Sequence, residues 1–85
     1  MTLDEILQDI HALEEDLLVY ERKYGIPTET FYESYMRGEE PEEIAWVPDW
    51  SMWAGAHEIL KDRQERYRKQ IGQAESTPNT NAALS

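Results

Sequence analysis

The stretch TLDEILQDIHALEEDLLVYERKYGIP, residues 2–27, decides the fold. Thr2 followed by Glu5 forms a capping box at the start of a helix. Gly25 supplies a left-handed C-cap, and Pro27 prevents the helix from continuing. Between these signals, apolar residues recur with an unbroken spacing of three and four, which is the period of one helical face: Leu3, Ile6, Ile10, Leu13, Leu17, Tyr20 and Tyr24. The sequence therefore predicts a long first helix that ends at Tyr24.

The same spacing returns in the second half of the chain, at Trp50, Trp53, His57, Leu60, Gln64, Tyr67 and Ile71. It predicts a second long helix that is entered at Pro48, with Asp49 as its N-cap. Between the two long helices, Thr28 is expected to cap a short helix over residues 29–37, which Gly38 ends. About 25 residues separate the long helices, which implies an antiparallel pair with the short helix and a loop folded over one end. The predicted fold class is all-α.

One helical domain is expected over residues 1–72, followed by a disordered tail over residues 73–85, which has no apolar period. The three tryptophans, Trp46, Trp50 and Trp53, fall within eight residues. Because tryptophan buries a large area and an 85-residue chain can build only a modest core, at least two of the three are expected in that core. Trp50 and Trp53 begin the second long helix where the first one ends, so their expected contacts are Tyr20, Tyr24 and Ile26.

Charge and composition exclude several classes of function. The chain has 18 acidic and 8 basic residues, which gives a formal net charge of −10. Such a surface repels phosphate backbones and anionic lipid headgroups, so neither nucleic acid nor a membrane is expected as the main partner. The absence of cysteine excludes disulfides and thiolate metal sites. With acidic residues at the amino terminus and no long apolar stretch, the chain is expected to be cytoplasmic.

No catalytic site, cofactor or metal is expected. His11 has only carboxylates near it on its helical face, without a second histidine in register. Small helical pyrophosphohydrolases bind magnesium through paired glutamates and a Glu-x-x-Asp motif. Here Glu58 and Asp62 are four residues apart, and Pro41 interrupts the glutamate run before them. The sequence therefore favours a protein that is not an enzyme.

Polar residues in the second long helix have two simpler interpretations. His57 and Gln64 share the apolar face, where polar side chains fix the register of helices that self-associate. The basic residues of this helix alternate with acids, as on a solvated surface, rather than form a nucleic-acid contact: Lys61, Arg63, Arg66, Arg68 and Lys69.

Two segments carry a resemblance to a known group of proteins: YERKYGIPTETFYESYMRGE, residues 20–39, and DWSMWAG, residues 49–55. They resemble small bacterial and archaeal proteins regarded as antitoxin-like members of toxin–antitoxin pairs. The pattern in that group is a first helix ending in Tyr-Gly, a short Phe-Tyr segment, and a Trp-Ala-Gly motif that opens the last helix. The chain departs from it in a longer acidic loop with Pro41 and Pro48, and in the added Trp46 and Trp50. The resemblance implies a helical protein that binds a cognate toxin.

Charge gives this role a physical basis. Ribonuclease toxins are basic at the cleft that holds RNA, so carboxylates can occupy that cleft while aromatic side chains anchor the contact. The residues expected to bind the partner are Tyr32, Tyr35, Glu39, Glu40, Glu42, Glu43, Trp46 and Asp49. The leading expectation is an antitoxin-like protein that neutralises a basic toxin. The alternative is a self-associating helical scaffold or adaptor, in which His57 and Gln64 set the register of a homodimer.

Overall fold

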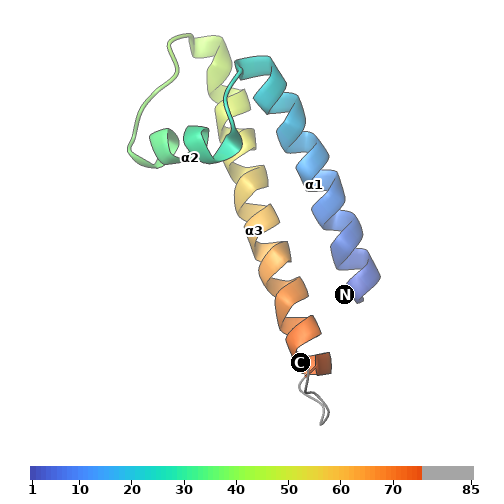
Figure 1. The fold of residues 1–85 in the computed structure, drawn as a ribbon. Helices are drawn as coiled ribbons and strands as arrows, with labels where there is room; N and C mark the ends of the chain where they lie inside the picture. Colours follow the sequence, from blue (N-terminus) through green and yellow to red (C-terminus); the bar gives the residue numbers. More distant parts are fainter. Residues whose placement is uncertain (76–85) are drawn as a thin grey trace.

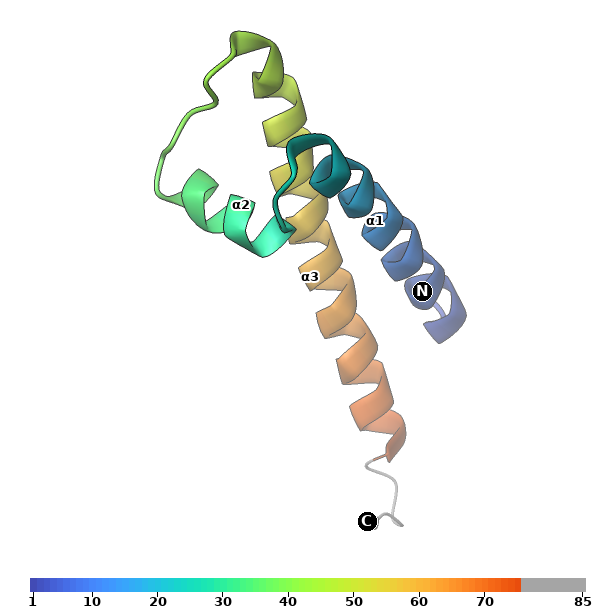
Figure 2. The same ribbon diagram turned by 45° about the horizontal axis from the view of Figure 1, so that its top comes forward.

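The protein is a helical hairpin with a short helix across one end. A computed structural model describes residues 1–75, which form α1 (Leu3–Tyr24), α2 (Thr28–Met36), a 3-10 turn η1 (Ile44–Trp46) and α3 (Val47–Glu75). Figure 1 shows α1 and α3 side by side and antiparallel, with α2 lying across α3 near the closed end of the hairpin. The turned view in Figure 2 keeps the same arrangement. The predicted all-α fold, with two long helices and a short one packed at one end, is confirmed.

Both predicted ends of α1 are confirmed. The backbone N–H of Glu5 donates to Thr2 Oγ1 at 3.1 Å, and the backbone N–H of Thr2 donates to Glu5 Oε1 at 2.9 Å. Gly25 follows the last residue with φ 76°, and its N–H donates to the carbonyl of Glu21 at 2.8 Å. A residue with a Cβ is strained at such a φ, so glycine is what allows the chain to turn here.

The start of α2 differs from the prediction because the chain uses a cap from another helix. Pro27 takes the N-cap position and Thr28 is the first helical residue, so the predicted cap by the Thr28 side chain is wrong. Instead the backbone N–H of Thr28 donates to Glu21 Oε2 at 2.8 Å. The Thr28 hydroxyl is thereby available to accept a hydrogen bond from Trp53 Nε1 at 3.0 Å. One residue thus joins α2 to both long helices.

The third helix is longer at both ends than the sequence indicates. It begins at Val47, so Asp49 lies inside the first turn and its predicted role as N-cap is wrong. Pro48 is tolerated in the first turn because no intrahelical partner exists there for the N–H that proline lacks. At the other end α3 runs to Glu75, three residues beyond the expected boundary. The remainder of the predicted tail, residues 76–85, lies outside the described residues.

The core is small and centred on one pair of rings. Trp53 and Phe31 are both 0% exposed, and their rings stack with centroids 3.8 Å apart and an interplanar angle of 1°. Tyr20 and Tyr24 of α1 stack on Trp53 at 5.7 and 5.6 Å, which confirms the expected contact of this tryptophan with both tyrosines. The buried apolar residues are Ile6, Ile10, Leu17, Phe31, Trp53, Ala54 and Leu60.

Candidate binding surface

The acidic loop between α2 and η1, residues 37–43, carries four exposed glutamates, Glu39, Glu40, Glu42 and Glu43. Glu39 Oε2 accepts hydrogen bonds from the Arg37 guanidinium at 3.1 and 3.3 Å. Among the described residues it is the only one of the four in an ion pair. Three negative charges of this loop are therefore uncompensated within residues 1–75.

A cavity of about 270 Å³ opens between this loop and the first turns of α3. Its wall combines apolar and acidic side chains, namely Tyr35, Glu39, Glu40, Pro41, Val47, Trp50 and Ser51. The Trp50 ring packs edge-on against Phe31, with centroids 5.2 Å apart. The Trp50 Nε1 atom is buried and has no hydrogen-bond partner among the described residues. An aromatic wall below carboxylates suits the apolar stem and cationic head of an arginine or lysine side chain.

Trp46 connects the loop to the core through aromatic contacts. It is partly buried, and its ring meets the ring of Tyr24 edge to face at 5.4 Å. From Tyr24 the contacts continue to Trp53, then to Phe31, and on to Tyr35, 5.6 Å from Phe31. The Tyr35 ring in turn stacks on Tyr32 at 6.5 Å. All three aromatic residues predicted to bind the partner, Trp46, Tyr35 and Tyr32, thus belong to one continuous run of rings.

Tyr32 does not line the cavity of the acidic loop. Its hydroxyl donates to Glu58 Oε2 at 2.8 Å, and its ring lies 4.5 Å from the imidazole of His57. The hydrogen bond to Glu58 raises the pKa of Tyr32 above its ordinary value. The structure therefore directs this predicted binding residue toward Glu58 and His57 of α3.

Asp49 has partners of its own. Its Oδ2 accepts from Lys23 Nζ at 2.6 Å and from the Tyr24 hydroxyl at 2.7 Å. The hydrogen bonds from Lys23 and then from Tyr24 lower the pKa of this carboxyl. Asp49 ties α3 to the end of α1, so less of its charge is available to a partner than that of the loop glutamates.

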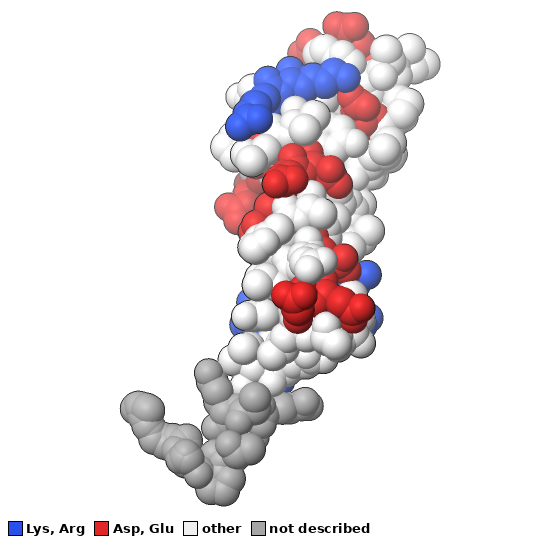
Figure 3. Space-filling model, turned by 90° about the vertical axis from the view of Figure 1, so that its right-hand side faces the viewer, with Lys and Arg blue, Asp and Glu red and all other residues white. Residues whose placement is uncertain are grey.

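Acidic side chains are also spread outside the loop. Figure 3 shows the α1 side of the molecule, where acidic residues form separate patches along the length and basic residues gather near the upper end. The last turn of α1 contains Arg22 and Lys23. In the loop, Glu39 and Glu40 line a cavity that has two aromatic residues, Tyr35 and Trp50, in its wall.

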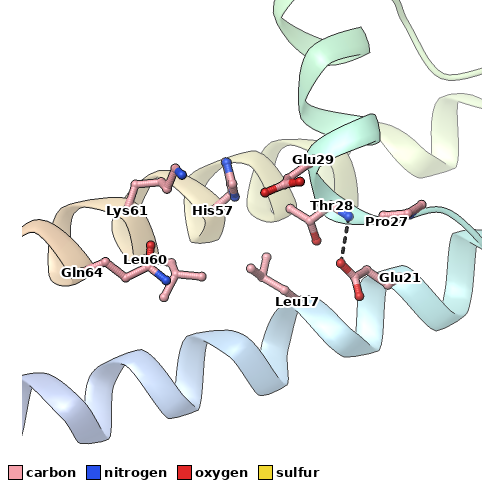
Figure 4. Close-up of a pocket in the computed structure, with 9 residues that line it drawn as sticks. All are labelled: Leu17, Glu21, Pro27, Thr28, Glu29, His57, Leu60, Lys61 and Gln64. Atoms are coloured by element: carbon pink, nitrogen blue, oxygen red, sulfur yellow. Dashed lines mark hydrogen bonds between the residues drawn. The ribbon is translucent and has the colours of Figure 1, made fainter.

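A second cavity, of about 250 Å³, lies where the three helices meet. Figure 4 shows His57, Lys61 and Gln64 of α3 above Leu17 of α1, with Glu29 of α2 close to the imidazole. The remaining lining residues are Glu21, Pro27, Thr28 and Leu60.

His57 is 8% exposed, and its Nδ1 is buried without a hydrogen-bond partner among the described residues. Burial, and next the charge of Lys61, lowers the pKa of His57. The ring is therefore neutral at pH 7. Because α2 of the same chain covers His57, its surroundings are intramolecular. Self-association through His57 and Gln64 stays a prediction.

His11 and Asp62 are of residue types that can bind a metal ion. Within the described part of the chain, no group of three or more histidine, aspartate and glutamate residues is placed to hold a metal ion. His11 is exposed. Asp62 pairs with Arg63 at 2.6 Å and with Arg66 at 3.0 Å.

Comparison with known proteins gives no match to a family model, a curated protein or a solved structure. Among the described residues, no helix has both the length and the apolar character needed to cross a bilayer.

The structure joins Tyr35, Glu39 and Glu40 of the predicted set in one cavity, and it adds Trp50, Val47, Pro41 and Ser51. The sequence places Trp50 on the apolar face by its spacing from Trp53, so the prediction assigned it to the core. It packs there with one part of its ring and lines the cavity with another. The glutamates around Pro41 mark the loop in the sequence, but no local pattern places Trp50 beside it.

Proposed function

We propose that this chain is an antitoxin-like protein that binds and neutralises a basic toxin of the ribonuclease type in the cytoplasm. One observation carries the proposal: Glu39 and Glu40 of the acidic loop line a cavity with an aromatic wall, on a chain of net charge −10. Glu40 and its neighbours Glu42 and Glu43 are in no ion pair within the described residues. Carboxylates attract a basic cleft over a distance and raise the association rate, whereas a cavity with aromatic walls slows dissociation once a side chain has entered it.

Binding uses the two parts of the surface differently. Glu40, Glu42 and Glu43 attract the partner, because no ion pair within the described residues offsets their charge. Trp46 provides contact area at the edge of the loop, since it is only partly buried in the free chain. Aromatic residues of this kind are the usual sites of large losses on truncation in protein interfaces.

The test compares two variants that each lose three charges. Glu40, Glu42 and Glu43 are replaced together by glutamine in the first. In the control, Asp4 becomes asparagine and Glu14 and Glu15 become glutamine, all at exposed positions of α1. Association with the product of the neighbouring gene is followed by surface-immobilised kinetics at low and at high salt.

The loop variant is expected to associate about tenfold more slowly at low salt, with a smaller difference at high salt. The α1 control is expected to lose at most a few-fold, because its charges lie away from the cavity. Equal losses in both variants would mean that net charge alone attracts the partner. If neither variant changes the kinetics, charge recognition by this loop is excluded.

A second variant tests whether Trp46 anchors the complex. Trp46→Ala should raise the dissociation rate by a factor that corresponds to roughly 2 kcal/mol. Circular dichroism and a melting curve must show that the variant remains folded, because the Trp46 ring also contacts Tyr24. Unfolding by this substitution would assign Trp46 to the core and move the anchor to another residue.

A further inference from the structure

A groove lies on the face of the hairpin turned away from α2. On α3, His57 and Glu58 contact Tyr32 of α2. At 100° per residue, Met52, Ala56 and Ile59 lie on the opposite side of that helix. Together with α1 they form a groove of about 270 Å³ lined by Asp16, Val19, Tyr20, Met52 and Ala56.

Large apolar side chains are open to solvent along this face. Val19 is 60% exposed, Met52 63% and Ile59 46%. Val19 and Met52 line one groove between two helices, and Ile59 lies seven residues after Met52, on the same side of α3. Scattered exposed apolar residues, in contrast, need no explanation. α2 packs on the other side of α3, where Tyr32 contacts His57 and Glu58, so α2 does not cover these three apolar side chains.

Charges on the face have an alternating arrangement. At the closed end of the hairpin, Lys23 of α1 pairs with Asp49 of α3 at 2.6 Å. At the other end, Asp9 of α1 pairs with Arg63 of α3 at 3.2 Å. The sign of the charge therefore changes along each helix over 14 residues, about 21 Å. It also changes across the groove, from α1 to α3. Asp16 lies midway along α1, level with the groove.

We propose that this face binds a second copy of the chain, with α1 of each copy packed against α3 of the other, about a two-fold axis parallel to the helices. In this arrangement Lys23 faces Asp49 of the second copy, and Asp9 faces Arg63 of the second copy. Asp16 faces Ala56 instead of another carboxylate. Each contact occurs twice, as a two-fold interface requires.

A second two-fold axis is possible in the plane of the face, perpendicular to the helices. It also pairs opposite charges at the ends of the groove. It places Asp16 against Asp16 of the second copy in the middle of the groove, however, and two carboxylates in a partly desolvated site repel each other. The parallel axis avoids this contact. Both axes leave every helix antiparallel to its neighbours, as in four-helix bundles, so the contact of Asp16 decides between them.

Size and net charge favour a second copy over another partner. α1 has 22 residues and the molecule is 23 Å across, so the face approaches the ~800 Å² that each partner contributes to a standard interface. The charged residues that line the groove or pair across its ends include two basic ones, Lys23 and Arg63, and three acidic ones, Asp9, Asp16 and Asp49. The whole chain has 8 basic and 18 acidic residues, so two copies repel each other less across this groove than their net charge implies.

Two methionines with the same exposure give a matched test. Met52 lies in the groove and Met36 at the end of α2, and each is 63% exposed. The full chain, Met52→Glu and Met36→Glu are measured by sedimentation equilibrium from about 1 to about 200 µM, a range that covers weak dimers.

The wild-type chain is expected to dimerise, and Met52→Glu to raise its dissociation constant at least about tenfold, because each dimer would bury two uncompensated charges. Met36→Glu should leave the constant unchanged. A wild-type chain that is monomeric throughout, or equal effects of both variants, would overturn the proposal.

Charge exchange then tests the direction of the axis. Asp9→Arg and Arg63→Asp should each weaken the dimer, and the double variant should restore it, because Asp9 and Arg63 face each other both within and between the copies. With the perpendicular axis Asp9 would face Lys23 of the second copy, so the double variant would stay weak. That result would overturn the parallel arrangement. Melting curves by circular dichroism confirm that each variant is folded.

This dimer is independent of toxin binding. Replacement of Glu40, Glu42 and Glu43 by glutamine should leave its dissociation constant unchanged or slightly lower it. A loss of dimerisation in that variant would place the acidic loop in the interface and overturn the assignment of the face.

Discussion

Thr28→Val removes the only hydrogen bond that the buried indole of Trp53 makes among the described residues. Valine has nearly the shape of threonine, so the packing at this 5% exposed position is kept while the hydroxyl acceptor is lost. A buried donor left without a partner costs about 1–3 kcal/mol. At ~4–8 °C per kcal/mol for a domain of this size, the melting temperature should fall by at least about 4 °C.

A double-mutant cycle separates this hydrogen bond from other effects. Trp53→Phe removes the indole N–H, so Thr28→Val should cost markedly less in that background, with a coupling of at least about 0.5 kcal/mol. Urea unfolding is followed by circular dichroism at 222 nm, because tryptophan fluorescence changes with the substitution itself. If Thr28→Val costs less than about 0.5 kcal/mol, or costs the same in both backgrounds, the hydrogen bond does not hold α2 on α3.

Three further predictions concern stability. Because burial lowers the pKa of His57, the unfolded chain takes up a proton near pH 6.5 that the folded chain takes up only at lower pH. The free energy of unfolding should therefore decline as the pH falls from 7 through about 6.5. His57→Gln should reduce this decline and His11→Gln should not, as measured by urea unfolding at several pH values. Identical pH profiles for the two variants would refute the role of burial. Leu17→Ala should cost about 2–5 kcal/mol and Leu18→Ala less than about 1 kcal/mol, since they are 6% and 43% exposed. Similar urea midpoints for both would place the core on another face of α1. Gly25→Ala should lower the unfolding free energy by about 1–2 kcal/mol, because φ is 76° there. An unchanged melting temperature would mean that the chain can end α1 in another way.

Local signals explain which parts of the fold could be predicted. The capping box of Thr2 and Glu5, and the stop at Gly25, depend on residues close in sequence, and both are present as expected. The predicted cap of α2 is wrong because the actual cap is not local. Its cap comes from Glu21, seven residues away on another helix. Thr28 therefore has a role that no local pattern specifies.

In the candidate site, too, local sequence predicts some features, and others depend on distant residues. The glutamates of the loop were recognisable because proline and charge keep that segment exposed. Asp49 also looked exposed in the sequence, but Lys23 and Tyr24, about 25 residues earlier, hold its carboxylate. The cavity at Trp50 depends on how the loop returns to α3, and a single sequence carries no measure of that path.

The run of rings from Trp46 through Trp53 to Tyr35 has a consequence for how this surface can change during evolution. A substitution of Trp46 or Tyr35 disturbs a ring that contacts the interior, so a new aromatic contact with a partner carries a cost in folding stability. The loop glutamates do not support the interior, since they are exposed and three of them are in no ion pair within residues 1–75. Adaptation to a different partner should therefore proceed first through the number and placement of acidic residues in the loop, while Trp46 and Tyr35 stay fixed.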